Sequence, residues 1–278
     1  MITFPGLHLS FSVQPVAFSI GGIPIYWYAI LIVMAILFSI VLLKRTEGEC
    51  GISFQDITDC ILYMLPIAFL SARAYYVIFQ WNYYQHHLSE IVQIRDGGMA
   101  IYGGIIGGVI TCLVFCHKRK LKIMDVLDYL APCLALGQAI GRWGNFFNQE
   151  AHGVETAFWG RMGIWENGIY QEVHPTFFYE SMGTFFLFLF LMQKMKHRQF
   201  SGELTLWYFV FYSFLRFWIE GLRTDSLMLG FVRISQVLSG VIFVVSCTLL
   251  VRNSKKQGKM SKNEEKCHTK ILQNEKKD

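Results

Sequence analysis

No Lys, Arg, Asp or Glu precedes Lys44 in this chain. Within that uncharged region, the apolar stretch from about Phe18 to Leu43 is longer than the roughly 20 residues that a helix needs to cross the hydrocarbon core of a bilayer. The basic pair Lys44 and Arg45 follows the apolar run instead of preceding it, which is not the order found in a signal peptide. The sequence therefore predicts that the first long helix of the chain spans a membrane.

The remainder of the chain repeats this pattern. Of its 278 residues, 53% are hydrophobic and only 16% are charged, a composition too apolar for a soluble domain of this length. Further apolar segments lie at about 57–80, 99–116, 124–141, 177–193, 204–220 and 234–251. We therefore predict an all-α, polytopic integral membrane protein with seven transmembrane helices.

The distribution of basic residues predicts the orientation of these helices. If the N-terminus lies outside and the C-terminus in the cytoplasm, every lysine falls in an inner segment. This agrees with the positive-inside rule and predicts that orientation.

The net charge of +5 comes from residues 252–278, which hold nine Lys or Arg and four Asp or Glu. The main body therefore has no basic face for nucleic acid. We predict a membrane domain over 1–252, an external loop or head at about 143–176, and a disordered charged tail over 253–278.

Polar residues within the apolar segments gather at one level, the outer leaflet of the predicted topology. Ionisable groups inside a bilayer are costly and mark either a functional site or a buried ion pair. The residues at this level are Arg73, Arg142, Glu180, Arg216, Glu220, Arg233 and Gln236. A transporter or channel for an anionic solute, the alternative function, would also need polar groups at the midplane and on the inner side.

Spacing within two of the segments indicates how these residues are arranged. Gln138, Arg142, Asn145 and Gln149 are spaced 4, 3 and 4 apart, which predicts one polar stripe on a helix. Arg216 and Glu220 are spaced as an i, i+4 ion pair, and Arg223 follows three residues later.

Arginines outnumber carboxylates at this level. The five arginines are 73, 142, 216, 223 and 233, and the nearby carboxylates are Glu150, Glu180 and Glu220. An excess of guanidinium groups favours a phosphate ligand, and an anionic phospholipid is the simplest candidate. The alternative for any single residue is a structural ion pair. We expect no metal or organic cofactor, because no cluster of His, Cys and carboxylate residues has ligand spacing.

The segment GRWGNFFNQEAHG, from Gly141 to Gly153, resembles the signature of the prolipoprotein diacylglyceryl transferases, G-R-x-G-N-F-x-N-x-E-x-x-G. The resemblance continues in the same order through most of the chain. The further matching segments are WY at 27–28, DGGM with a following GG pair around Tyr102, HPTFFYE at 174–180, and LRFWIEGLR at 215–223.

The resemblance implies an enzyme of the bacterial plasma (inner) membrane with its active site toward the outer leaflet. Its reaction transfers the diacylglyceryl group of phosphatidylglycerol to the lipobox cysteine thiol in the signal peptide of a prolipoprotein, forming a thioether and releasing glycerol phosphate. The partners are then these two substrates and the lipid bilayer, without nucleic acid. By position, the resemblance assigns activity or binding to Tyr28, Arg142, Asn145, Glu150, Gly153, Arg216 and Glu220.

This chemistry requires a thiol that loses its proton and a phosphate that leaves. We expect Arg142 and Arg216 to hold the phosphate, Glu150 and Glu220 to orient the arginines, and Asn145 to donate to headgroup oxygens. The candidates for the proton acceptor are Glu150, then His174, then Tyr102, which stands where many relatives have histidine. The remaining residues that we expect to contact substrate are Tyr28, Arg73, Gly153, His174, Glu180, Arg223 and Gln236.

Overall fold

The computed structural model describes residues 2–93, 97–166, 168–224, 228–229 and 232–275. The chain divides into two compact units, and each is described by itself. The first unit comprises residues 1–42 and 128–278, and the second comprises residues 43–127.

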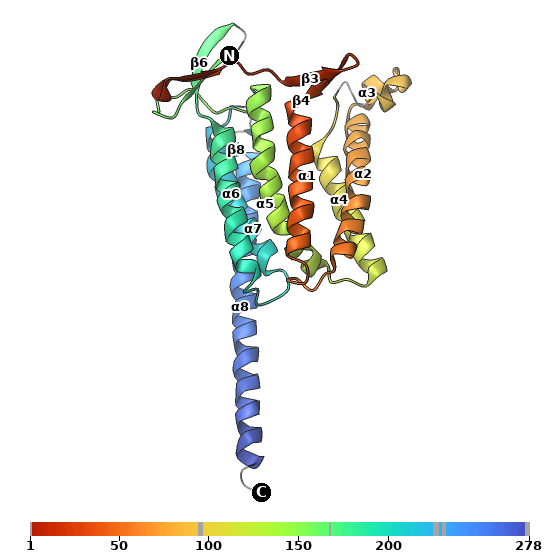
Figure 1. Cartoon of the computed structure of the whole chain (residues 1–278), viewed down its shortest axis with the longest axis vertical. Helices are drawn as coiled ribbons and strands as arrows, with labels where there is room; N and C mark the ends of the chain where they lie inside the picture. Colours follow the sequence, from red (N-terminus) through yellow and green to blue (C-terminus); the bar gives the residue numbers. More distant parts are fainter. Residues whose placement is uncertain (1, 94–96, 167, 225–227, 230–231, 276–278) are drawn as a thin grey trace. The chain divides into compact units, whose positions relative to one another are not determined.

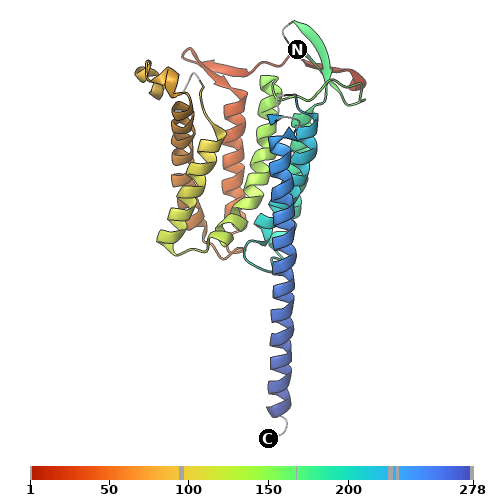
Figure 2. The same ribbon diagram turned by 180° about the vertical axis from the view of Figure 1, so that it is seen from behind.

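Long helices make up most of the first unit. They are α1 (Trp27–Arg45), α5 (Ile123–Asn148), α6 (Thr176–Met195), α7 (Glu203–Leu222) and α8 (Ile234–Glu275). Helix α7 packs against both α6 and α8, as the two opposite views in Figures 1 and 2 also show. Helix α8 continues through most of the segment 253–278, for which the sequence predicts a disordered tail, and the domain boundary at 252 stays a prediction.

A small antiparallel sheet lies at one end of these helices, where the sequence predicts an external head. Its strands are β1 (Ile2–Phe4), β2 (Leu9–Phe11), β5 (Met162–Glu166) and β6 (Ile169–Val173), in the order β2-β1-β5-β6. A short 3-10 turn, Pro5–Leu7, joins β1 to β2. The side chains of Ile2, Met162, Ile164, Val173 and Phe177 form a buried cluster that attaches the sheet to the start of α6. The all-α prediction is therefore incomplete, because the head is built from strands.

The predicted start of the first helix is also wrong. Residues before Trp27 form a hairpin of β3 (Val16–Ile20) and β4 (Ile23–Tyr26), which leads directly into α1 (Figure 1). Gly21 and Gly22 form its two-residue turn with φ of 57° and 81°, a conformation that glycine adopts without steric cost. The apolar run continued through this turn, so hydropathy alone did not separate the strands from the helix.

The second unit is an antiparallel helix pair with short connecting helices. Helix α2 (Phe54–Phe79) packs along α4 (Ile101–Arg119), and α3 (Trp81–Tyr84) and a 3-10 turn (Leu88–Val92) lie between them in the chain. Gly103 and Gly107 make this contact possible, because a Cβ atom on either would lie within 2.5 Å of Ser71. The packing role of the glycine-rich segment is thus close backbone approach.

Among the residues that the structure describes, five helices are long and apolar enough to cross a membrane: α1, α2, α4, α5 and residues 234–259 of α8. Helices α6 and α7 each have 20 residues, and α7 carries Glu203, Arg216 and Glu220. The fold is that of a mostly helical, polytopic membrane protein. The expected count of seven spans and the orientation of the termini stay predictions. A pair of two-residue strands, β7 (Met228–Leu229) and β8 (Val232–Arg233), precedes α8.

One buried carboxylate on α5 forms hydrogen bonds with the turn between α6 and α7, which is distant from it in the sequence. Asp128 is fully buried and accepts hydrogen bonds from the backbone N–H of Gly202 at 2.7 Å and of Thr205 at 2.8 Å. It also accepts from the Thr205 hydroxyl at 2.8 Å and from Arg198 Nη1 at 3.1 Å. These bonds satisfy N–H groups at the start of α7 that have no partner within the helix.

We therefore expect Asp128→Asn to lower the free energy of unfolding by about 3 kcal/mol, because an amide nitrogen would face donors at a buried site. The measurement is thermal unfolding of the purified protein in detergent. Asp59→Ala is the control, since it removes an exposed ion pair to Arg119 and is expected to cost less than about 1 kcal/mol. Equal stability losses in the two variants would contradict this interpretation of Asp128.

Candidate active site

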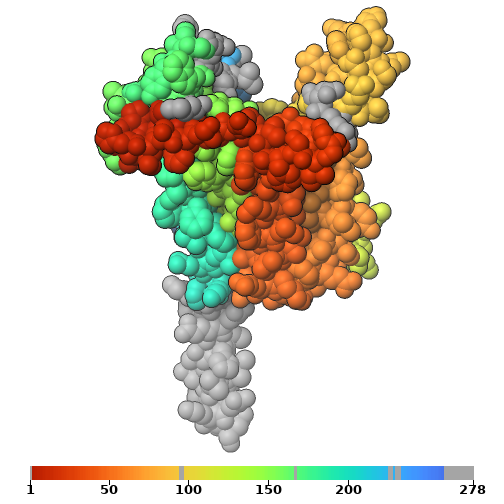
Figure 3. Space-filling model, turned by 45° about the horizontal axis from the view of Figure 1, so that its top comes forward, coloured from red at the N-terminus to blue at the C-terminus, as the bar shows by residue number. Residues whose placement is uncertain are grey.

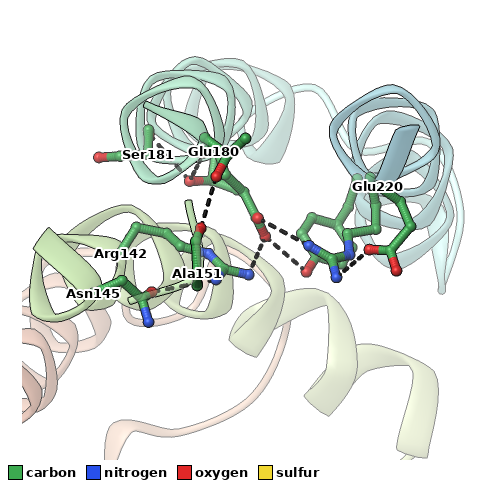
Figure 4. Close-up of polar contacts among 10 residues, drawn as sticks. Arg142, Asn145, Ala151, Glu180, Ser181 and Glu220 are labelled. Atoms are coloured by element: carbon green, nitrogen blue, oxygen red, sulfur yellow. Dashed lines mark hydrogen bonds and ion pairs between the residues drawn. The ribbon is translucent and has the colours of Figure 1, made fainter. Parts of the chain in front are cut away.

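The centre of the site is the carboxylate of Glu180, which is 1% exposed and lies in the first turns of α6. Arg142 Nη2, from α5, donates to it at 2.6 Å, and Arg216 Nη1, from α7, donates at 3.3 Å. The hydroxyl of Tyr212 donates to the same carboxylate at 3.1 Å. Figure 4 shows the Glu180 side chain pointing between the helices that carry Arg142 and Glu220. Three helices therefore converge on one buried negative charge.

The pair predicted from spacing on α7 is present. Arg216 Nη2 lies 2.5 Å from Glu220 Oε2, and the Glu220 side chain is almost fully buried. Arg233, the last residue of β8, donates from Nη1 to the backbone carbonyl of Glu220. Two guanidinium groups, those of Arg142 and Arg216, thus contact two buried carboxylates, and that of Arg233 contacts the backbone beside them.

The end of α5 adds the amides of two asparagines and a third carboxylate, that of Glu150. Arg142 Nη1 donates to Asn145 Oδ1 at 3.3 Å, and Asn145 Nδ2 donates to Glu150 Oε1 at 3.1 Å. Asn148 Nδ2 donates to the same Glu150 oxygen at 3.1 Å. A chain of hydrogen bonds therefore connects Glu150 with Glu180 through Asn145 and Arg142.

The predicted stripe on this helix is shorter than expected. Helix α5 ends at Asn148, and Gln149 and Ala151 have positive φ of 56° and 57°. The Gln149 amide donates to the carbonyl of Val13 at 3.3 Å instead of continuing the stripe. The left-handed residues turn the chain back over the helix end and bring Glu150 toward Asn145.

Tyr28, in the first turn of α1, packs directly on α5. A Cβ atom on Gly144 would lie 1.9 Å from its ring, so this glycine of the signature segment admits the tyrosine. The neighbouring Trp27 ring stacks on Phe147 with centroids 4.9 Å apart. These contacts fix the start of α1 against the helix that carries Arg142 and Asn145.

Gly153 lies where two segments cross. Its N–H donates to the carbonyl of His174 at 2.9 Å, it forms an antiparallel bridge with Arg223, and a Cβ atom there would lie 2.7 Å from the His174 side chain. His174 Nδ1 lies 3.3 Å from the Tyr179 hydroxyl, and burial lowers the pKa of His174. Gly153 is therefore required for close backbone approach, and His174 is a neutral imidazole near pH 7.

Gln236 lies beside the cluster on α8. Its Nε2 donates to the carbonyl of Phe217 at 3.1 Å, and both residues line an apolar groove of about 580 Å³ between α7 and α8. The rest of the groove is lined by Val237, Gly240, Val241, Val244 and Val245.

Arg73 has a different environment, in the second unit. Its Nε donates to the carbonyl of Ile91, its Nη1 to Gly97 and Gly98, and its Nη2 to Glu90 and Gln93, at 2.7 to 3.1 Å. All five N–H groups of the guanidinium are thus used by backbone carbonyls, and the residue is only 7% exposed. In this conformation Arg73 organises a loop, and it has no donor left for a phosphate.

Tyr102 also belongs to the second unit, in the first turn of α4, where it is 55% exposed. Two residues that the sequence analysis did not single out enter the site, Tyr212 and Asn148. Tyr212 precedes Arg216 by four residues on the same face of α7, and Asn148 is the second asparagine of the signature segment. Both signals were available in the sequence. Among the described residues, no group of three His, Cys, Asp or Glu side chains is arranged to hold a metal ion.

Comparisons with a family model and with individual known proteins point to the same family. Residues 15–252 match the family described as prolipoprotein diacylglyceryl transferase. The chain is similar to proteins named phosphatidylglycerol–prolipoprotein diacylglyceryl transferase from several bacteria. The relative from Finegoldia magna is 48% identical over 241 residues, covering 86% of this chain and 96% of the relative. Those from Ligilactobacillus salivarius and Clostridium novyi are 45% and 44% identical, covering 84% and 87% of this chain and 90% and 96% of the relatives.

The family match spans every element of the cluster around Glu180, from the start of α1 to α8, and it includes both arginines that share this carboxylate. The chain belongs to the prolipoprotein diacylglyceryl transferase family.

Proposed function

We propose that this protein transfers the diacylglyceryl group of phosphatidylglycerol to the lipobox cysteine of prolipoproteins, the first step of lipoprotein maturation. The observation that carries the proposal is the pair of guanidinium groups, Arg142 and Arg216, held on one buried carboxylate. We further propose that all seven long helices span the plasma membrane, with the N-terminus outside and the active site at the outer leaflet.

The bonding of the two arginines supports a role in binding the phosphate. Each guanidinium has five N–H groups, and the contacts with Glu180, Asn145 and Glu220 engage two on each arginine. Both side chains are about one-fifth exposed. The remaining N–H groups of each guanidinium can bind two oxygens of an incoming phosphodiester in a forked, bidentate arrangement. The apolar groove beside Gln236 would receive an acyl chain of the same lipid.

The reaction forms a carbon–sulfur bond and breaks a carbon–oxygen bond. The thiol, with an ordinary pKa of about 8.5, gives up its proton, and its sulfur attacks the glycerol carbon that bears the phosphate. Glycerol phosphate leaves with the electron pair of the broken bond. Arg142 and Arg216 stabilise the negative charge that develops on it, and Glu180 and Glu220 hold both arginines in place.

For the proton acceptor we propose Glu150. Asn145 and Asn148 both donate to its Oε1, and Asn145 also contacts Arg142. His174 is the second candidate, because burial lowers its pKa and leaves the imidazole able to accept a proton. Tyr102 is the third. We propose that Tyr28 shapes the site by packing on Gly144, and that Gly153 and Arg223 shape it through their antiparallel bridge. Gln236, which lines the apolar groove, would lie next to the lipid.

The direct test uses purified protein in vesicles that contain phosphatidylglycerol, with a lipobox peptide as acceptor. We expect the peptide to gain the mass of a diacylglyceryl group while an equal amount of glycerol phosphate is released. A Cys→Ser peptide should give neither product. If the folded protein forms no adduct but carries anionic solutes across the vesicle membrane, the transferase proposal is wrong.

In the same assay, Arg142→Lys and Arg216→Lys are expected to lower kcat by about 100-fold or more, because lysine keeps the charge but loses the fork that binds two oxygens. Asn145→Ala should also lower activity while folded protein still accumulates. Melting temperatures measured on the same preparations separate lost chemistry from lost structure. Full activity in either lysine variant would refute the assignment of phosphate binding to these arginines.

Arg73→Lys should behave differently from Arg142→Lys. Lysine offers three N–H donors in place of the five that bind backbone carbonyls at 90, 91, 93, 97 and 98, so we expect a lower melting temperature. Activity per folded molecule should fall far less than in Arg142→Lys. A normal melting temperature with abolished activity would instead return Arg73 to the binding site.

The proton acceptor can be identified from pH profiles of kcat. We expect Glu150→Gln to lower kcat by about 100-fold or more, the usual contribution of a general base. His174→Gln should stay within about 10-fold of the unmodified protein across pH 5 to 9. If instead the His174 variant loses the activity, and the unmodified enzyme loses it as pH falls through the lowered His174 pKa, His174 is the base.

A further inference from the structure

The hairpin of β3 and β4 has one entirely apolar face. In its register Phe18 is opposite Ile25, and Ile20 is opposite Ile23, so these four side chains share that face. Ile20 is 64% exposed, and Phe18 and Ile23 are about half exposed. Figure 3 shows the N-terminal strands, coloured red, at the surface of the molecule. The face is therefore a continuous apolar surface that the described residues leave largely uncovered.

The opposite face of the same hairpin is different in character. Ser19 is opposite Pro24 there, and both are exposed. Soluble proteins protect exposed strands with charged side chains, and this hairpin, like the whole region before Lys44, has none. A two-stranded hairpin alone is only marginally stable in water. An uncharged hairpin with one apolar face and a serine on the other is suited to a boundary between water and lipid.

The connection to α1 identifies that boundary. Strand β4 ends at Tyr26 and α1 begins at Trp27, so no linker separates the hairpin from a helix long and apolar enough to cross a membrane. The N–H of Trp27 donates to the carbonyl of Pro15 at 2.9 Å, which fixes the base of the hairpin to the first residue of the helix. Trp27 and Tyr28 are the aromatic types that gather at membrane interfaces.

We infer that the β3–β4 hairpin is an interfacial membrane anchor, with Phe18, Ile20 and Ile23 in contact with the acyl chains of the leaflet in which α1 begins. Ser19 and Pro24 then face the headgroups and water. The five residues of β3 extend only about 17 Å, so the turn at Gly21 and Gly22 stays within reach of the same interface.

The anchor has a consequence for the reaction, which rests on the proposed function. Tyr28 packs on Gly144 and Trp27 stacks on Phe147, so the base of the hairpin is fixed to the helix that carries Arg142 and Asn145. By holding the start of α1 at the interface, the hairpin sets the depth of these two side chains relative to the lipid phosphates.

The test of the anchor does not depend on activity. Nitroxide labels are attached to Ile20→Cys and, as the matched control on the opposite face, to Ser19→Cys, in the full chain reconstituted in phosphatidylglycerol-containing vesicles. Electron paramagnetic resonance then measures collisions with oxygen, which dissolves in lipid, and with a water-soluble nickel chelate. The unmodified protein carried through the same labelling supplies the background of the native cysteines.

We expect the ratio of oxygen to nickel collisions to be several-fold higher at position 20 than at position 19. Equal, water-like ratios at both positions would overturn the anchor. Protection of position 20 from both reagents would also overturn it, because the face would then be covered by protein.

A second measurement tests the consequence for the reaction. Ile20→Asp should raise the KM for phosphatidylglycerol, expressed as its mole fraction in the vesicle, several-fold while kcat is largely kept. Ser19→Asp should leave both near their original values. Equal changes in the two variants would contradict the link between hairpin and site. Absence of transferase activity in the unmodified protein would count against the proposed function and leave the spectroscopic result intact.

Discussion

The buried carboxylate of Glu180 is the interaction on which the arrangement of the site depends. A carboxylate that is almost fully removed from solvent must be compensated by nearby donors, and here Arg142, Arg216 and Tyr212 supply them from two other helices. The three donors limit how α5, α6 and α7 can rotate relative to one another. Apolar side chains can hold helices together at least as well as a buried ion pair can, so the charges are better explained by what the exposed parts of the guanidinium groups bind.

Two arginines show that the hydrogen bonds of a guanidinium indicate its role better than its depth in the membrane does. Arg73 and Arg142 were both predicted at the outer level of the membrane. The five N–H groups of Arg73 are all used by backbone carbonyls, whereas Arg142 contacts two side chains and is partly exposed. A guanidinium whose donors are all engaged stabilises a fold, and one with donors left over can bind an anion. Sequence gives the positions of arginines but not this difference.

The parts of the structure that the sequence predicted well are those determined by local pattern. Helices α2, α4, α6 and α7 begin and end within a few residues of the apolar segments, because their ends coincide with charged or polar residues. The ion pair between Arg216 and Glu220 follows from helical spacing alone. The hairpin before α1 and the head sheet were missed. The hairpin turn interrupts no apolar run, and β1 pairs with β5 through Thr3 and Gly163, which are far apart in sequence.

The central role of Glu180 was missed for a related reason, since it depends on three helices meeting at one point. The contacts around the end of α5 show the same dependence on distant parts of the chain. Tyr28 occupies the space beside Gly144, the Val13 carbonyl receives the Gln149 amide, and Phe4 stacks near Phe146 with centroids 6.5 Å apart. The turn that brings Glu150 to Asn145 is thus contacted by Val13, which precedes the first long helix. Val13 lies in the short connection between β2 and β3, so the segment that contacts this turn leads directly into the β3–β4 hairpin. The anchor that we infer and the base that we propose are thus connected through one continuous segment of the chain.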